Sequence, residues 1–325
     1  MSIWSGPKTR RSEDEWADAA RRVLLAVIDR EHAVTIRELE ARASDRVYHP
    51  QIDPFPIDPD LLGKARPELL QEGAISFTSA PSRQHPEPIT TWHREPTRGM
   101  QERINTTSAR KRLLTVRHNG WGNRGGAGRG LIGAAGESAA HKAMMTAQGL
   151  GSITGVTGSI DEVLGVRAGE IDNSAFVIDR SDGLQLIQIL VEVKNQRPWY
   201  YPKNPELQTF LQKAALIQDA NPNQLILPVL VARRRHQSTW ENGEEVGYLP
   251  TYCGAQMVRS DSELDEKLFN EVRVGLGYDD MILGDEPTNR HLGIMRDAIP
   301  KFDLRRARSW SQSYVDYLPK SPDLF

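Results

Sequence analysis

The stretch GEIDNSAFVIDRSDGLQLIQILVEVKN, residues 169–195, decides how the rest of the chain is interpreted. Two runs rich in Ile, Val, Leu and Phe, each about the length of a strand, flank residues 180–183, whose composition favours a turn. This pattern predicts a β-hairpin. Because side chains alternate between the two faces of a strand, Glu192 and Lys194 share one face near the end of the second strand.

The turn decides whether Asp172 joins these two side chains. If residues 181–183 form a three-residue loop with Gly183 at positive φ, Asp172 falls directly opposite Glu192. If Asp182 and Gly183 instead form a two-residue turn, the register shifts by one and Asp172 points away. In the first case two carboxylates and one ammonium group converge.

An Asp and a Glu that face each other across a hairpin are hard oxygen ligands suited to Mg²⁺ or Mn²⁺, which bind phosphate oxygens through the rest of their shell. A lysine two residues after the glutamate can hold the attacking water or stabilise the charge of a phosphoryl transition state. The alternative is that Glu-x-Lys at the end of an apolar strand is only a solvated strand end.

Asp172, followed after nineteen residues by Glu192-Val193-Lys194, resembles the PD-(D/E)XK nuclease superfamily. Ile171 stands where the name of the superfamily has proline. The resemblance implies a restriction-endonuclease-like fold, an α/β core with a mixed sheet flanked by helices. It also implies that the protein is an enzyme, a Mg²⁺- or Mn²⁺-dependent endodeoxyribonuclease.

Members of this superfamily often carry a glutamate on a helix before the hairpin. Residues 133–145 form an Ala-rich helical pattern with Glu137 near its start. The resemblance therefore implies four catalytic residues, of which the three acids are the metal ligands: Glu137, Asp172, Glu192 and Lys194.

Residues 12–93 form the first organised part of the chain. Capping signals at Ser12, Thr35 and Asp58 predict three helices, and Pro67 is expected to interrupt or restart the third. Two short strands, residues 74–79 and 89–93, are expected to follow. Three helices and a hairpin resemble a winged helix, a DNA-binding module, although the same order also occurs in structural extensions and protein-docking domains. We assign residues 1–98 to this domain.

Residues 103–136 contain no acidic residue. The glycines of residues 120–136 predict flexibility, so we interpret residues 99–130 as a linker that also contacts DNA phosphates. The alternative is a solvated charged linker. The residues expected to contact DNA here are Arg110, Lys111, Arg112, Arg117, Arg124 and Arg129.

Residues 131–325 are expected to form the nuclease domain. After the hairpin, Trp199 and Tyr200 lie in an aromatic and basic loop and are expected to contact a nucleotide, or else to pack the loop. A helix at 206–220, strands at 225–232 and 254–258, and two further helices within 261–302 complete the expected core.

Composition limits the function. The net charge is −2, so any affinity for nucleic acid must come from local patches. The single cysteine, Cys253, excludes an internal disulfide and a Cys-based zinc site. Residues 125–130 lack the Gly-Lys-Ser/Thr ending of a P-loop, so no nucleotide cofactor is expected. The absence of a signal peptide and of a long apolar segment predicts a cytoplasmic protein with no membrane partner.

These features together predict a DNA endonuclease that acts on double-stranded DNA, in restriction or another defence against foreign DNA, with or without a requirement for a modified base. The alternatives are a repair or junction-resolving nuclease and a DNA-binding regulator on an inactive nuclease scaffold. A homodimer is expected, because one active centre attacks one strand of a duplex.

Overall fold

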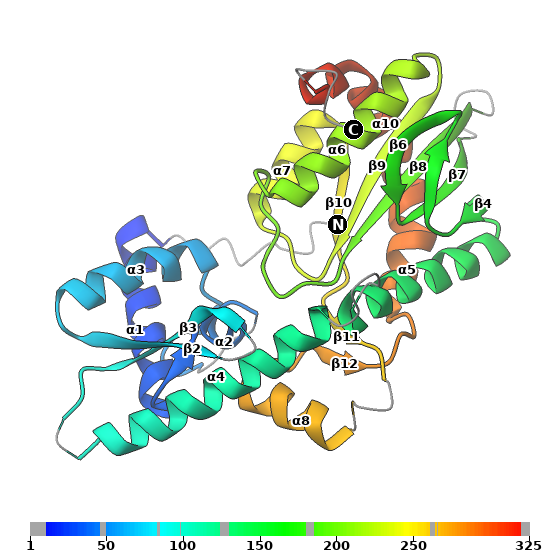
Figure 1. Cartoon of the computed structure of the whole chain (residues 1–325). Helices are drawn as coiled ribbons and strands as arrows, with labels where there is room; N and C mark the ends of the chain where they lie inside the picture. The colour runs from blue at the N-terminus through cyan, green and yellow to red at the C-terminus, as the bar shows by residue number, and fades with distance from the viewer. Residues whose placement is uncertain are drawn as a thin grey trace. The chain divides into compact units, whose positions relative to one another are not determined.

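The chain forms two units. The computed structural model describes residues 11–45, 50–82, 85–97, 99–123, 130–179, 185–260, 264 and 266–319. The first unit comprises Met1–Arg124 and Asp261–Met281, and the second comprises Gly125–Ser260 and Ile282–Phe325. Both contain helices and strands, so the protein is mixed α/β (Figure 1).

The first unit begins with the predicted helices α1 (Glu13–Glu31), α2 (Ile36–Ala43) and α3 (Pro59–Gln71). Ser12 forms the predicted capping box at the start of α1, and the side chain of Thr35 caps α2. These caps satisfy backbone N–H groups that have no partner within the helix. Local sequence therefore determines where these helices begin.

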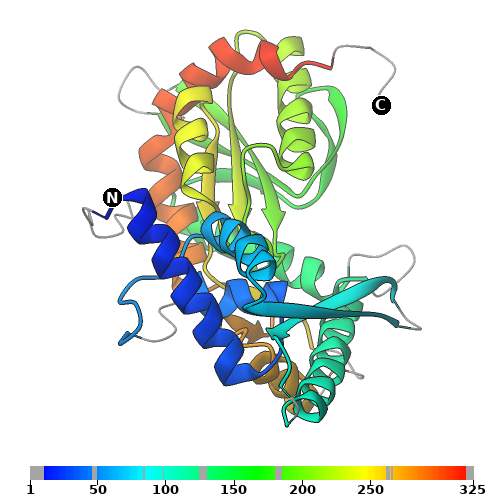
Figure 2. The same cartoon turned by 90° about the vertical axis from the view of Figure 1, so that its left-hand side faces the viewer.

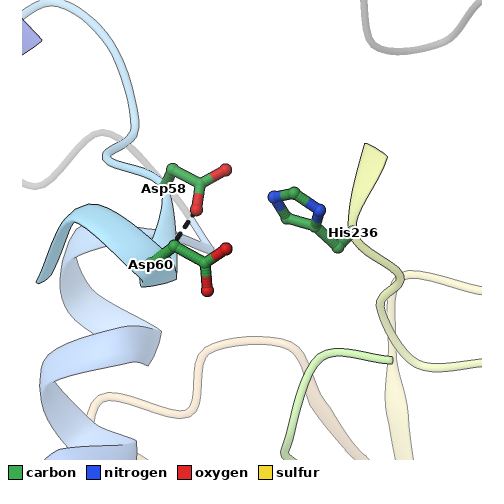
Figure 3. A group of neighbouring side chains, drawn as sticks. All are labelled: Asp58, Asp60 and His236. Carbon is green, nitrogen blue, oxygen red and sulfur yellow. Dashed lines mark hydrogen bonds between the residues drawn. The ribbon is translucent and has the colours of Figure 1, made fainter. Parts of the chain in front are cut away.

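Helix α3 starts as predicted but does not break where predicted. The Asp58 side chain accepts a hydrogen bond from the Asp60 backbone N–H at 2.8 Å (Figure 3), and Pro59 follows the cap. Pro67 lies inside a continuous helix, so the expected interruption is wrong. A proline costs about 3 kcal/mol inside a helix, and burial of one apolar face offsets it. The buried residues of that face are Leu62, Ala65 and Leu69.

The first unit also contains a sheet of three antiparallel strands, in the order β1 (Val34–Thr35), β3 (His85–Arg94), β2 (Ile75–Ser82). Figure 2 shows β2 and β3 as a long twisted hairpin. The two predicted strands are thus confirmed and are longer than expected. Apolar residues of α1, α2, α3 and β2 form one buried cluster that holds the helices together.

Residues 101–123 are not a linker. They form α4 (Gln101–Asn123), a helix of 23 residues in the first unit, whereas residues 124–129 lie outside the described part of the chain. The buried face of α4 mixes apolar and polar residues, so no apolar stripe is visible in the sequence. Its buried residues are Ile104, Ser108, Lys111, Leu114, Val116, His118 and Trp121.

Helix α8 (Glu266–Gly275) packs against α4. A Cβ on Gly275 would lie 2.4 Å from Leu114 Cδ1, so the two helices are in close contact at this glycine. Residues 261–281 therefore belong to the first unit, and the predicted single nuclease domain over 131–325 is wrong in this respect. A packing partner so distant in sequence leaves no local signal.

A five-stranded mixed sheet is the centre of the second unit. Its strand order is β10 (Leu249–Tyr252), β9 (Leu225–Ala232), β8 (Gln185–Lys194), β7 (Asn173–Asp179), β4 (Thr154–Thr157). Strands β10, β9 and β8 are parallel, and β7 is antiparallel to β8 and β4. The predicted hairpin and the strand at 225–232 are confirmed.

Helices flank this sheet on both faces (Figure 1). Helix α5 (Leu131–Gly149), predicted from its alanines, packs with α10 (Ile299–Ser313) on one face, where Val191 and Val193 point. Helix α6 (Pro205–Ala220) packs on the other face, where Leu190 points. Because helices cover both faces of the sheet, residues 187–193 of β8 are all buried.

The remaining elements are short. His236 caps α7, its ring accepting a hydrogen bond from the Ser238 backbone N–H; Figure 3 draws this histidine as well. After α8 the chain forms a run of consecutive helices from Asn289 to Ser313 in place of the single second helix expected. None of the described helices has the length and apolarity needed to cross a membrane. The elements not yet given are β5 (Ile160–Val163), β6 (Val166–Ile171), α7 (Gln237–Val246), β11 (Gln256–Val258), β12 (Met281–Leu283), α9 (Asn289–Gly293), η1 (Ile294–Ala298) and η2 (Tyr314–Tyr317).

Candidate active site

The register of the β7–β8 hairpin places Asp172 opposite Glu192. Asp179 pairs with Gln185 and Asn173 pairs with Val191, so the next pair along is Asp172 and Glu192. This is the register that a three-residue loop predicts, and a two-residue turn would shift it by one. The loop itself, residues 180–184, lies outside the described residues.

Asp172 lies at the break between two strands. The preceding strand, β6, pairs with β5 and not with the main sheet, so the chain changes partners at this residue. Asp172 Oδ2 accepts a hydrogen bond of 2.7 Å from the backbone N–H of Val193. A carboxylate bonded to the neighbouring strand is held in a fixed orientation beside Glu192.

Glu192 is almost fully buried, with 7% of its surface exposed. Its Oε1 lies 2.9 Å from Lys194 Nζ, whereas Oε2 accepts no hydrogen bond from any described residue. Burial raises the pKa of Glu192, and the charge of Asp172 raises it further against the opposing effects of Lys194 and Lys213. A buried carboxylate oxygen without a donor fits a hard divalent cation, so this pair suits the expected Mg²⁺ or Mn²⁺.

Lys194 lies between two carboxylates. Besides Glu192, its ammonium group is 3.8 Å from Glu206 Oε2 in the first turn of α6. Burial opposes the charged form of Lys194, but Glu192, Glu206 and Asp172 together raise its pKa above the ordinary value. The side chain therefore carries its proton at neutral pH and acts as a cation.

Glu206 is a site residue that was not predicted from the sequence. Its carboxylate accepts hydrogen bonds from the hydroxyl of Tyr200 and from the side-chain amide of Gln196. Burial opposes ionisation of Glu206, but the Tyr200 and Gln196 hydrogen bonds and the charge of Lys194 lower its pKa overall. In the sequence, an acidic residue shortly after Asn204 indicates only the N-terminus of a helix. Its contact with Lys194 could not be predicted from that pattern.

Tyr200 is a structural residue of this site and not a surface aromatic. It is fully buried, and its burial and its bond to Glu206 raise its pKa far above the ordinary value. The expectation that Tyr200 contacts a nucleotide is therefore wrong, because the ring has no exposed face. Trp199 is partly exposed, and its contact with a nucleotide stays a prediction.

Glu137 lies in the second turn of α5, next to Gly136. One turn further along the helix, His141 Nδ1 is 2.8 Å from Oδ1 of Asn173, the residue after Asp172. Residues four apart share one face of a helix. Glu137 thus lies on the helix face that meets the hairpin beside Asp172, and its binding to a shared ion stays a prediction.

Asn195, directly after Lys194, fixes α5 against the end of β8. Its side-chain amide donates to the carbonyls of Ile132 and Met257, at 2.6 Å and 2.7 Å, and its oxygen accepts from the Met257 backbone N–H. Asn195 is buried, so these bonds are not shared with solvent. Its position immediately after the Glu-x-Lys pattern was the only sequence signal for this role.

The cations expected to contact DNA divide into several groups. Arg110 is exposed on α4, and Arg117 pairs with Glu271 of α8 at 3.0 Å. Arg112 reaches two threonine hydroxyls of the β2–β3 hairpin at 3.5 Å, a weak contact. Arg124 and Arg129 lie outside the described residues.

Lys111 does not face solvent, so its predicted role as a phosphate contact is wrong. Its ammonium group bonds to the buried Glu38, lies 3.0 Å from Glu31 and donates to the Gly275 carbonyl at 2.7 Å. Glu38 also pairs with Arg42 at 3.0 Å. This buried ion cluster, Glu31, Glu38, Arg42 and Lys111, joins α1, α2, α4 and the end of α8.

Comparison with known proteins identifies no relative. No protein-family model, no curated protein and no solved structure gives a significant match to the chain. The candidate site therefore stands on its own geometry.

Proposed function

We propose that the protein is a metal-dependent DNA endonuclease of the PD-(D/E)XK superfamily. The observation that carries the proposal is the hydrogen bond of 2.7 Å from the Val193 backbone N–H to Asp172 Oδ2, which holds Asp172 beside Glu192, with Lys194 Nζ 2.9 Å from Glu192. The order of α5, the β7–β8 hairpin, α6 and β9 around one mixed sheet supports it, because the superfamily core has this order. Fold alone does not establish function, so the site carries the argument.

The chemistry divides among the residues of the site. A Mg²⁺ or Mn²⁺ ion held by Asp172 and Glu192 would polarise the scissile phosphate and activate water. The Val193 amide keeps Asp172 oriented toward Glu192. Lys194 supplies a positive charge next to the charge that develops on the phosphate, and Glu192 and, to a smaller extent, Glu206 keep that ammonium group protonated.

The first unit is proposed to bind DNA. Its helices α1, α2 and α3, followed by the β2–β3 hairpin, have the element order of a winged helix. Double-stranded DNA is the proposed substrate, and restriction or another defence against foreign DNA is the proposed role. A nuclease that carries its own DNA-binding unit and does not depend on an ATP-driven motor can select its target by a short DNA sequence or a modified base alone. This is the property that a restriction enzyme requires.

A homodimer is the proposed working unit, because each chain has one such centre and a double-strand break needs two. Light scattering at micromolar concentration, with and without a duplex, tests this. A chain that stays monomeric in both conditions and still makes a double-strand break in one binding event would refute the dimer.

The decisive experiment is digestion of methylated and unmethylated plasmids with Mg²⁺, with the products mapped by sequencing.

Asp172→Asn and Glu192→Gln should abolish cleavage and leave duplex affinity unchanged, because each removes an ionic metal ligand and preserves side-chain shape. Glu162→Gln is the matched control, since Glu162 is an exposed acid of the same unit and pairs with Arg167 at 3.1 Å. Undiminished cleavage by either site variant would refute the assignment. Binding of the wild type to DNA without cleavage on either plasmid would favour a regulator.

A further inference from the structure

Three guanidinium groups and two aromatic rings form one alternating stack in the second unit. Arg290 Cζ lies 4.1 Å from the ring centre of Tyr252, and Arg235 Cζ lies 5.4 Å from the same ring. Arg235 Cζ is also 4.6 Å from the ring of Trp240, which Arg306 approaches to 4.5 Å. The stack joins the segment after β9 to β10, α7, α9 and α10.

The charges of this stack are not balanced. Arg306 is neutralised by Glu244 at 2.9 Å and donates to the Tyr248 carbonyl. Within the described part of the chain, no carboxylate lies at ion-pair distance from Arg235 or Arg290. Arg235 Nε is buried and has no hydrogen-bond acceptor among the described residues.

Arg235 is partly buried near two other guanidinium groups, those of Arg306 and Arg290. Burial lowers the pKa of Arg235 to about 10, and the charges of Arg306 and Arg290 contribute to the decrease. Arg235 and Arg290 are both partly exposed, so an anion from solution can reach them. Two guanidinium groups on the same ring, with no carboxylate partner among the residues that the structure describes, favour binding of an anion.

The stack lies at the same edge of the sheet as the candidate active site. Lys194 of β8 pairs with Ala232 of β9, and Ala232 pairs with Tyr252 of β10. Two strand spacings of about 4.8 Å separate Lys194 from Tyr252, or roughly 10 Å. The backbones of Tyr200 and Arg235 also form an isolated bridge, and Tyr200 bonds to Glu206 beside Lys194.

We propose that Arg235 and Arg290 bind one backbone phosphate of the duplex whose scissile phosphate lies at Lys194. Contact with the ring of Tyr252 restricts the movement of both guanidinium groups. A guanidinium group offers several N–H donors in a fork geometry that suits phosphate oxygens. The inference rests on the proposed function for the identity of the polyanion.

The salt dependence of duplex binding tests the inference. Affinity is measured by fluorescence anisotropy in EDTA, which prevents cutting, for the wild type and for Arg235→Gln combined with Arg290→Gln. The slope of log affinity against log salt should fall by about 0.9 if one phosphate contact is lost. Arg296→Gln is the matched control, because Arg296 is exposed and neutralised by Asp297 at 2.7 Å, and its slope should equal that of the wild type. An unchanged slope in the double variant would overturn the inference.

A second measurement uses the wild type and does not depend on whether the variants fold. An arginine-specific dicarbonyl reagent should modify Arg235 and Arg290 in the free protein, as mapped by mass spectrometry, and a duplex should protect both. Inorganic phosphate at the same phosphate concentration should protect neither. Equal protection by inorganic phosphate, or no protection by the duplex, would refute the proposed duplex contact.

The two proposals fail in different ways. If the slope of log affinity against log salt falls in the double variant but the wild type does not cleave DNA, the proposed phosphate site stands and the proposed nuclease activity is refuted. Cleavage by the wild type with an unchanged slope in the variant would retain the nuclease and refute the phosphate site.

Discussion

Gly136 of α5 packs so closely against Asn195 that a Cβ on Gly136 would lie 2.4 Å from the Cβ of Asn195. No pair of Cβ atoms approaches this closely without movement of one backbone, so only glycine is compatible with this helix position. The contact brings the turn of α5 that carries Glu137 against the residue that follows Lys194. The close packing at Gly136 thereby fixes the position of Glu137 relative to Asp172 and Glu192.

Gly136→Ala should destabilise the protein by about 1–3 kcal/mol, because the added methyl group forces α5 away from β8. Urea unfolding monitored by circular dichroism measures this. Gly149→Ala is the matched control at the other end of α5, where a Cβ meets no atom within 4 Å, and it should be neutral or stabilising by up to about 1 kcal/mol. Equal stability of the two variants would contradict the close packing at Gly136.

Stabilisation by Mg²⁺ should increase with pH. The pKa of Glu192 in the folded protein is raised above 4.5 by burial and by Asp172. The metal-free folded state is therefore favoured by the bound proton below pH 4.5, and this contribution is lost as pH rises through the raised pKa. An ion that requires the ionised carboxylate should then raise Tm more at neutral pH than at pH 4.5, and should not do so in Glu192→Gln. A Mg²⁺ effect independent of pH would argue against Glu192 as a ligand.

Lys194→Ala should lower the cleavage rate by about 10² or more while duplex affinity changes little, because the ammonium group acts on the transition state. Single-turnover cleavage and anisotropy measure the two quantities separately. Lys203→Ala removes an exposed lysine of the same unit and should leave the rate unchanged. A fall in affinity as large as the fall in rate would identify Lys194 as a phosphate anchor only.

Glu206→Gln should reduce the rate roughly tenfold, as expected for a residue that positions another. Removing this carboxylate lowers the pKa of Lys194, so the alkaline limb of the pH–rate profile should move to lower pH. Tyr200→Phe removes a hydrogen bond to Glu206 but preserves its charge, and should leave that limb where it is in the wild type. Identical pH profiles for Glu206→Gln and the wild type would show that Glu206 does not act through Lys194.

Lys111→Met should destabilise the first unit by about 3–5 kcal/mol, because it leaves Glu38 buried without its ammonium partner. Arg110→Met, an exposed position on the same helix, should change the free energy of unfolding by less than about 0.5 kcal/mol. Urea unfolding separates the two. Should Lys111→Met be as stable as Arg110→Met, the buried ion cluster would have no structural role.

The sequence by itself determined the elements whose signals are local. The two apolar runs on either side of residues 180–183 predicted the hairpin of Asn173–Asp179 and Gln185–Lys194, whereas the sequence left two registers open and the structure selected the one that places Asp172 opposite Glu192. Local patterns also predicted four other elements: the alanines predicted α5, the capping residues predicted α1 and α2, and the apolar run predicted β9. In each case the deciding interaction joins residues close in sequence, so composition and spacing record it.

Only the tertiary structure decided which charged and aromatic side chains are free to bind a ligand. Lys111 and Arg110 are adjacent cations in the sequence, yet one pairs with Glu38, 73 residues away, and the other faces solvent. Tyr200 and Glu206 became parts of the candidate site only when β8 and α6 packed together. The free energy of a charge or hydroxyl depends on its burial and its partners, and folding sets both by joining segments that are distant along the chain.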